Sequence, residues 1–122
     1  AYHLATVLDD YALGVTDVIR GADLLEPTAS QLHLMRLLNL DAPRYGHVPV
    51  ALDEHRRKLS KAAAAQATST SPPQRILLAV LRFLNQPIPE GARDVAVAEL
   101  LANAVEAWDP SVVSRVREAV LE

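Results

Sequence analysis

The first fifty residues alternate short apolar runs with polar breaks, a pattern typical of an α/β fold. The run YHLATVL at residues 2–8 is mostly apolar and ends at Asp9-Asp10, which favours a buried strand. The stretch GVTDVIRG at residues 14–21 is rich in β-branched side chains and bounded by glycines, so it predicts a second strand. Strict alternation of Val48, Val50 and Leu52 predicts a third.

A helix is predicted between the second and third strands. Thr28 and Gln31 have the spacing of a capping box, and the helix should stop before Pro43, because the residue before a proline avoids the helical region. Its apolar face consists of Leu32, Met35 and Leu38. Pro49 cannot donate a ladder hydrogen bond, so the third strand should lie at a sheet edge or be irregular there.

The character of the chain changes after residue 61. The stretch AAAAQATSTSPP is a small-residue linker, and we place a domain boundary near residue 70, between an α/β part at 1–70 and a small all-α part at 71–122. Ser71 can cap a helix that begins at Pro72-Pro73, and Asp109-Pro110 can cap and start the last of three helices. The apolar positions of the three helices are Leu77, Val80, Leu81 and Leu84; Val97, Leu100, Leu101, Ala104, Val105 and Trp108; and Val112, Val116 and Val120. We expect Trp108 to belong to the core.

Composition narrows the possible functions. The chain has 122 residues, a formal net charge of −3 and no cysteine, which argues against an obligate polyanion binder and excludes disulfides and thiolate zinc sites within it. The apolar run ILLAVL at 76–81 is too short to span a bilayer, and the N-terminus has no signal-peptide pattern. Because the chain opens directly in strand-like sequence without an initiator methionine, we expect it to be a piece of something longer.

Four cationic side chains nevertheless gather between Arg56 and Lys61. Lys58 and Lys61 are three positions apart, so on a flexible loop both ammonium groups can reach one polyanion, with the Ser60 hydroxyl as a further donor. Such a clamp would stabilise charge on a transferring phosphoryl or adenylyl group. The alternative is a solvated basic loop, which this short pattern alone does not exclude.

Arg20 is the second candidate, since it ends an apolar strand at the position where strand tips meet ligands in open α/β sheets. There it can grip a carboxylate through two parallel hydrogen bonds, or form a structural ion pair with Asp17, Asp23 or Glu26. The pair Asp9-Asp10 could serve acid/base or metal chemistry, but such a pair more often ends a strand and caps a turn. Histidines 3, 33, 47 and 55 have no metal-binding spacing.

Five stretches together resemble a known family. YHLATVLDD, GVTDVIRGADLL, TASQ, RYGHVPVAL and KLSK follow one another as in the second half of the catalytic domain of the glutamyl class I aminoacyl-tRNA synthetases. The last stretch matches that family's KMSKS signature. The resemblance covers residues 1–61, and it implies the C-terminal half of a Rossmann-like catalytic domain followed by a helical, stem-contact-like region.

Within the family, RGADLL and the helical tail look most like the short paralogues that attach glutamate to the queuosine base of tRNA(Asp). The resemblance implies that Tyr2 and Arg20 hold glutamate. It also assigns an ATP-binding set, which consists of Asp23, Val50, Ala51, Lys58, Ser60 and Lys61. Lys58 and Lys61 are the catalytic members of that set, because the family's mobile-loop lysines neutralise the ATP phosphates during adenylate formation.

The same resemblance implies the cofactors and partners. They are ATP with Mg²⁺, glutamate and tRNA(Asp), for a cytoplasmic enzyme with no membrane contact and a monomeric full-length form. Zinc is expected only in the first half of such an enzyme, which also holds the HIGH-like motif. Since that half is not in this chain, we expect the chain alone to be inactive. An alanine run after KLSK departs from the family pattern, and such a run would alter the dynamics of this loop more than its contact with phosphate.

Three other functions remain open at this point. The chain could be a fragment of a discriminating glutamyl-tRNA synthetase, or a non-catalytic module whose helices dock a protein partner. A small nucleic-acid binder that uses Arg56 to Lys61 is disfavoured by the net charge and by the shortness of that patch.

Overall fold

The computed structural model describes residues 2–59 and 72–121. Contacts divide the chain into two compact units, residues 1–48 and 49–122, which are described separately below. The boundary predicted near residue 70 falls outside the described residues and stays a prediction.

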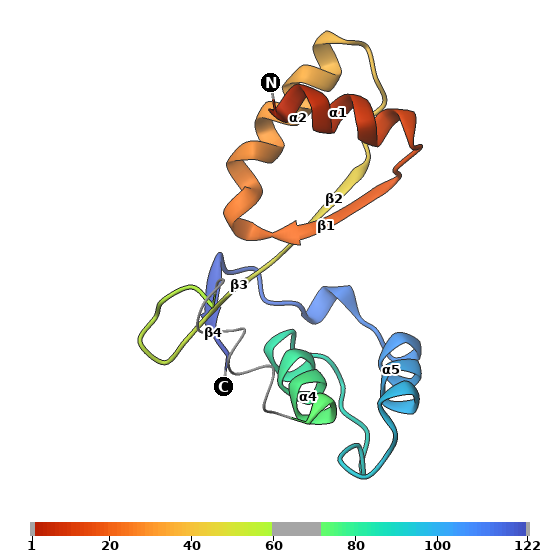
Figure 1. Ribbon diagram of the computed structural model, residues 1–122, viewed down its shortest axis with the longest axis vertical. Helices are drawn as coiled ribbons and strands as arrows, with labels where there is room; N and C mark the ends of the chain where they lie inside the picture. The colour runs from red at the N-terminus through yellow and green to blue at the C-terminus, as the bar shows by residue number, and fades with distance from the viewer. Residues whose placement is uncertain (1, 60–71, 122) are drawn as a thin grey trace. The chain divides into compact units, whose positions relative to one another are not determined.

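Unit 1 is built around a strand–helix–strand motif (Figure 1). Its elements are α1 (Tyr2–Ala12), β1 (Asp17–Gly21), the 3₁₀ turn η1 (Ala22–Leu24), α2 (Leu25–Leu37) and β2 (Arg44–Val48). Strands β1 and β2 pair in parallel from Asp17↔Arg44 to Gly21↔Val48, and α2 supplies the crossover that parallel strands require. The predicted α/β character and the predicted second strand are confirmed.

The first predicted strand is wrong, because residues 2–12 form helix α1. Leu4, Val7, Leu8 and Tyr11 recur at helical spacing, and Val7 is fully buried. The pair Asp9-Asp10 accordingly lies within the helix instead of ending a strand.

The predicted capping box is also wrong. Helix α2 already begins at Leu25, so Thr28 and Gln31 lie inside it, and both are buried. Neither side chain caps the helix, because the N-cap residue is Leu24 and it makes no side-chain hydrogen bond. The helix does end before Pro43, as expected.

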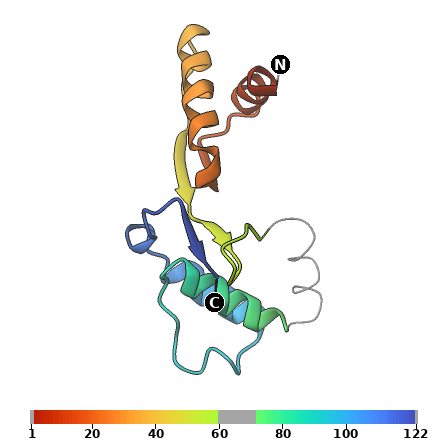
Figure 2. The same ribbon diagram turned by 90° about the vertical axis from the view of Figure 1, so that its left-hand side faces the viewer.

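Unit 2 contains a second parallel pair of strands, β3 (Val50–Leu52) and β4 (Glu118–Val120), which lie side by side in Figure 2. Pro49 separates β2 from β3, which confirms the predicted irregularity. Two helices follow in the described part, α4 (Pro73–Phe83) and α5 (Val97–Glu106). The predicted third helix is wrong: the Asp109 side chain accepts a hydrogen bond from the Ser111 amide, but the turn it caps, η2 (Pro110–Val112), is only three residues long. The chain then extends into β4.

The core of unit 2 joins α4 to α5 through Leu78, Leu81, Leu100 and Ala104. Buried Gln86 closes one end of this core, because its amide oxygen accepts from the Asp109 amide at 2.9 Å while its amide nitrogen donates to the Leu84 and Asp109 carbonyls at 3.0 Å.

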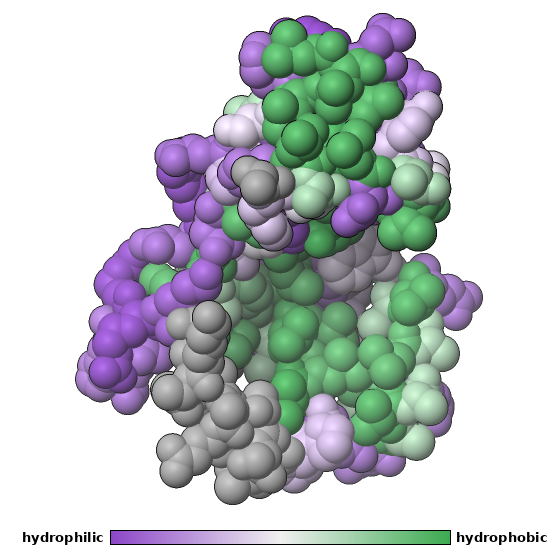
Figure 3. All heavy atoms as spheres, turned by 45° about the horizontal axis from the view of Figure 1, so that its top comes forward, coloured by the Kyte–Doolittle hydropathy of each residue, from purple (hydrophilic) through white to green (hydrophobic). Residues whose placement is uncertain are grey.

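Trp108 does not belong to this core, since 44% of it is exposed. Trp108 follows α5 in the chain and, with Leu101 and Val105, lines an apolar hollow whose other side is formed by α4. Figure 3 shows apolar surface on both units. No helix among the described residues is long and apolar enough to cross a membrane.

Helices α1, α2 and α4 end in the same way. The residue after each C-cap, Gly14, Asn39 or Asn85, has a left-handed φ between 53° and 68°. In α2, the Asn39 amide donates to the Arg36 carbonyl and the Leu40 amide donates to the Met35 carbonyl, which is the hydrogen-bond pattern of a Schellman motif.

Asn39 offers a test of this helix end. Asn39→Ala should lower the free energy of unfolding by about 1 kcal/mol, because alanine tolerates a left-handed conformation less well than asparagine. Asn39→Gly should leave the free energy of unfolding unchanged or raise it slightly, because glycine adopts that conformation freely. Urea denaturation measures both variants. A glycine variant less stable than the alanine variant would contradict the assignment.

Candidate functional site

Arg20 and His47 face each other near the carboxyl ends of β1 and β2. The strand register pairs Arg20 with His47, one residue before each strand ends. Ligands of open α/β sheets bind outside the carboxyl ends of the strands. These two side chains therefore lie where such a site is expected.

The Thr28 hydroxyl on α2 joins the two strands. Its oxygen is 2.7 Å from the Leu24 carbonyl, 2.6 Å from Arg20 Nη2 and 2.8 Å from His47 Nε2. A hydroxyl has one proton to donate and two lone pairs to accept with. Since the proton is donated to Leu24, the lone pairs accept from Arg20 and from His47, which puts a proton on His47 Nε2.

The Arg20 guanidinium is fixed from two further directions. Nη1 donates to Gln31 Oε1 at 2.8 Å, and the guanidinium carbon lies 4.6 Å from the centroid of the Tyr45 ring. Gln31 is only 2% exposed, so it holds its amide oxygen rigidly.

The bonding of this guanidinium leaves donors to spare. Its hydrogen bonds to Thr28 and Gln31, both neutral, use two of its five N–H groups, and the neutral Tyr45 side chain is a further hydrogen-bond partner. The buried Nε has no hydrogen-bond partner within the described residues.

The surroundings keep His47 neutral. Burial and then the nearby Arg20 charge lower the pKa of His47 below its ordinary value of 6.5. The Tyr45 ring stacks on His47 with centroids 6.4 Å apart, and burial raises the pKa of Tyr45. The cluster thus holds one permanent cation, Arg20, beside neutral Thr28, Gln31 and His47, while the Asp10 carboxylate of α1 acts on Tyr45.

Asp17 and Tyr2 make their contacts outside this cluster. Asp17 pairs with Arg44, with Nε and Oδ1 2.7 Å apart, so the alternative of an Arg20–Asp17 ion pair is wrong. Tyr2 begins α1, is 75% exposed and packs edge-on against His3. No hydrogen bond or ring contact joins it to Arg20 within the described part of the chain. Asp23 lies exposed in η1.

In unit 2, the basic stretch is organised by Asp53. One carboxylate oxygen accepts from the amides of His55 and Arg57, at 3.0 and 2.8 Å, and the other binds the Arg57 guanidinium. These bonds, those to the Arg57 amide first, hold the pKa of Asp53 below its usual value. Arg56 has a left-handed φ of 60° and reaches Glu118 at 3.5 Å. Two of the four clustered cations therefore stabilise a turn.

The predicted ATP residues of unit 2 flank this turn. Val50 and Ala51 lie in β3, where the Val50 amide donates to the Arg117 carbonyl and the Ala51 carbonyl accepts from the Leu59 amide. Lys58 follows the turn, is exposed and bridges to Leu52. Ser60 and Lys61 lie outside the described residues, so the lysine clamp stays a prediction.

Sequence reasoning missed the partners of Arg20. Thr28 and Gln31 were assigned to a helix cap, and neither Tyr45 nor His47 was assigned a role. The available signal was the pair of parallel strands, since Arg20 and His47 stand at equivalent positions near their ends.

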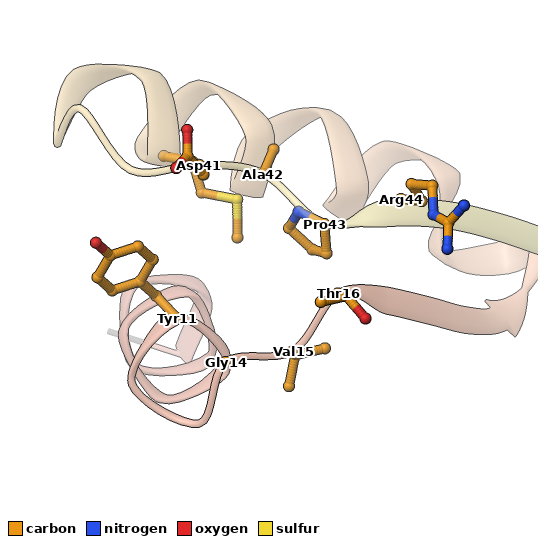
Figure 4. Close-up of a pocket in the computed structure, with 9 residues that line it drawn as sticks. Tyr11, Gly14, Val15, Thr16, Asp41, Ala42, Pro43 and Arg44 are labelled. Atoms are coloured by element: carbon orange, nitrogen blue, oxygen red, sulfur yellow. The ribbon is translucent and has the colours of Figure 1, made fainter.

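One hollow of unit 1 is lined by none of the predicted site residues. A hollow of about 270 Å³ lies at the opposite, amino ends of β1 and β2, where Tyr11 and Thr16 face Asp41 to Arg44 (Figure 4). The described residues contain no group of three or more acidic or histidine side chains that could hold a metal ion.

The lowered pKa of His47 gives a prediction with a definite sign. The unfolded chain protonates His47 more readily than the folded chain does. The contribution of neutral His47 to the free energy of unfolding is therefore complete above about pH 6.5, and it is lost as the pH falls through the folded-state pKa.

Arg20→Gln should raise the pKa of His47, because a nearby positive charge is removed. Arg44→Gln, which removes an exposed charge of the same unit, should not change it. NMR titration of the His47 ring measures both, and an equal response in the two variants would contradict the cluster.

Comparison with known proteins supplies the family. A model of the catalytic domain of class I tRNA synthetases (E and Q) matches residues 1–95. The chain is 44% identical over 113 residues to the glutamyl-Q tRNA(Asp) synthetase of Pectobacterium atrosepticum, a match that covers 93% of this chain and 35% of that protein. It is 45% identical over 120 residues to the enzyme of the same name from Serratia proteamaculans, covering 98% of this chain and 39% of that protein.

The fold agrees with this match. A glutamate tRNA ligase from Elizabethkingia meningosepticum, solved in complex with its amino acid, superposes with a TM-score of 0.70 at 21% identity, over 100% of this chain and 28% of that chain. The chain spans little more than a third of the length of the two glutamyl-Q relatives. The architecture is that of part of a class I catalytic domain, and the chain belongs to the family of class I tRNA synthetases for glutamate and glutamine.

Proposed function

We propose that this chain forms part of an ATP-dependent ligase that activates glutamate and transfers it to tRNA. The observation that carries the proposal is the Arg20 guanidinium, held at the carboxyl end of β1 by neutral partners with N–H groups to spare. A carboxylate is the group that an arginine in this state binds best, through two parallel charge-assisted hydrogen bonds. Glutamate is the proposed source of that carboxylate, because the relatives that this chain resembles are named for glutamate.

The chemistry would run in two steps. An oxygen of a glutamate carboxylate would attack the α-phosphorus of ATP, the bond from that phosphorus to the oxygen bridging to the β-phosphorus would break, and pyrophosphate would leave. Lys58 and Lys61 would stabilise the negative charge that collects on the leaving phosphates. A tRNA nucleophile then attacks the acyl carbon, and AMP leaves.

The queuosine base of tRNA(Asp) is the proposed acceptor. The support is that two relatives, 44% and 45% identical over nearly the whole chain, are glutamyl-Q tRNA(Asp) synthetases by name. Glutamylation of tRNA(Asp) that carries queuosine, compared with tRNA(Glu), distinguishes this acceptor from that of a discriminating synthetase. ATP and Mg²⁺ as cofactors, a cytoplasmic location and a monomeric full-length form stay predictions, as does zinc in a part of the enzyme beyond this chain.

The phosphate clamp is tested by ATP–pyrophosphate exchange with glutamate, in the full-length protein that carries this chain. Lys61→Ala should lower the exchange rate on the order of 100-fold, the scale of losing one charge-stabilising contact. Arg56→Ala is the matched control, because it removes a cation of the same stretch that contacts Glu118, and it should cost less than about threefold. No exchange by the wild type, with or without tRNA, would leave the non-catalytic docking module as the better account.

The carboxylate site is tested through Gln31, a positioning residue. Gln31→Leu should raise the KM for glutamate about tenfold, the scale of one hydrogen bond to a charged group, while the KM for ATP stays unchanged. Gln31→Glu should raise the KM for glutamate further, because the new carboxylate competes for Arg20. Circular dichroism checks that both variants fold. Equal increases in the two KM values would show that Gln31 supports the fold alone.

A further inference from the structure

His47 belongs to the Arg20 cluster, yet the proposed function gives it no role. Its Nε2 lies 2.8 Å from the Thr28 hydroxyl oxygen, and Arg20 Nη2 lies 2.6 Å from the same oxygen. The two nitrogens are therefore no farther apart than the sum of these two distances. Since the strand register also pairs Arg20 with His47, the imidazole and the guanidinium are direct neighbours on the side of the strands that faces α2.

The protonation chemistry of His47 is set by Thr28. The hydroxyl proton is donated to the Leu24 carbonyl, so His47 must carry a proton on Nε2 in order to bond the Thr28 oxygen. The nitrogen left to titrate is Nδ1. A proton taken up there from solvent makes the ring a cation and keeps the bond from Nε2 to Thr28. Protonation therefore adds a positive charge beside Arg20 without dismantling the cluster.

Arg20 is the charged neighbour to which His47 responds. Burial and then the Arg20 charge lower the pKa of His47. The Tyr45 ring, which stacks on His47 from the same strand, is neutral. The group of α2 that contacts His47 is the hydroxyl of Thr28, which is neutral as well.

Carboxylates of the neighbouring elements do not offset the Arg20 charge at His47. Asp10 of α1 acts on Tyr45, and Asp23 of η1 is exposed; within the described part of the chain, neither contributes to the pKa of His47. A carboxylate bound to Arg20 would supply the opposite charge that this ring lacks, because an anion nearby favours the protonated form of an imidazole.

We propose that His47 is a positioning residue for the carboxylate that Arg20 binds, and that its ring takes up a proton at Nδ1 when this carboxylate binds. The proton comes from solvent, and the imidazolium then attracts the carboxylate together with Arg20. This inference rests on the proposed function, in which the carboxylate belongs to glutamate. By linkage, a proton on His47 tightens carboxylate binding by the same factor by which the carboxylate favours the proton.

The test follows the His47 ring by NMR in the full-length protein, titrated with acid in the presence and absence of saturating glutamate. Glutamate should raise the pKa of His47, and the dissociation constant of glutamate should be about threefold lower at about pH 5.5 than at about pH 7.5. His47→Gln should abolish this pH dependence, because an amide does not titrate. His33→Gln, the same substitution at an exposed histidine of α2, is the matched control and should keep it.

A second pair of variants separates positioning from folding. His47→Leu removes the donor to Thr28 and should raise the KM for glutamate about fivefold, the scale of one hydrogen bond, while the KM for ATP stays unchanged. His47→Gln keeps an N–H group that can bond Thr28, so it should weaken glutamate binding less than His47→Leu does. Circular dichroism compares the fold of both variants with that of the wild type.

The outcomes distinguish this inference from the proposed function. Glutamate binding that is lost in Arg20→Gln but leaves the pKa of His47 unchanged would overturn the role of His47 alone. The same holds for a dissociation constant that varies with pH equally in the wild type and in His47→Gln. A wild-type protein that does not bind glutamate would overturn the carboxylate site itself, and the role of His47 with it.

Discussion

The Thr28 hydroxyl is the group on which unit 1 depends most. It has one proton and two lone pairs, and all three are used by groups from η1, β1 and β2. It thereby fixes the direction of the Arg20 guanidinium and the tautomer of His47 at the same time. A methyl group in its place would leave two nitrogen donors facing each other without an acceptor, so the arrangement tolerates little change at this position.

The sequence predicted elements whose signals are local. The second strand, the helix end before Pro43, the break at Pro49 and the Asp109 cap follow from side chains within a few positions. Arg20 was found because it ends a strand. The first helix was missed because a seven-residue apolar run fits a strand and a helix equally well. The Arg20 cluster and β4 were missed because their partners are distant in sequence, as His47 is from Thr28.

The effect of a charged side chain in this chain depends on its individual ion pairs. The stretch from Arg56 to Lys61 looked like one basic patch in the sequence, yet Glu118 binds Arg56 and Asp53 binds Arg57. The arginines of α4, scattered in the sequence, gather around one hollow instead. Helical periodicity brings residues seven apart onto one face, and a loop adds a third. Net charge and local runs therefore describe this surface poorly, and carboxylate partners decide which cations remain available.

The two parallel strand pairs differ in the sequence separation of their strands, and therefore in the time between the synthesis of one strand and of its partner. Residues 17 and 44 pair in unit 1, whereas residues 50 and 118 pair in unit 2, a separation of 68 positions. As the chain leaves the ribosome, β1 and β2 can associate soon after their synthesis. Strand β3 is synthesised early but cannot pair with β4 until residues 118–120 have been added. During that interval the backbone groups of β3 that pair with β4 lack their partners, which leaves one edge of β3 exposed to other chains. Slow translation between residues 52 and 118 would lengthen this vulnerable period, so the cell's chaperones have more to protect in unit 2 than in unit 1.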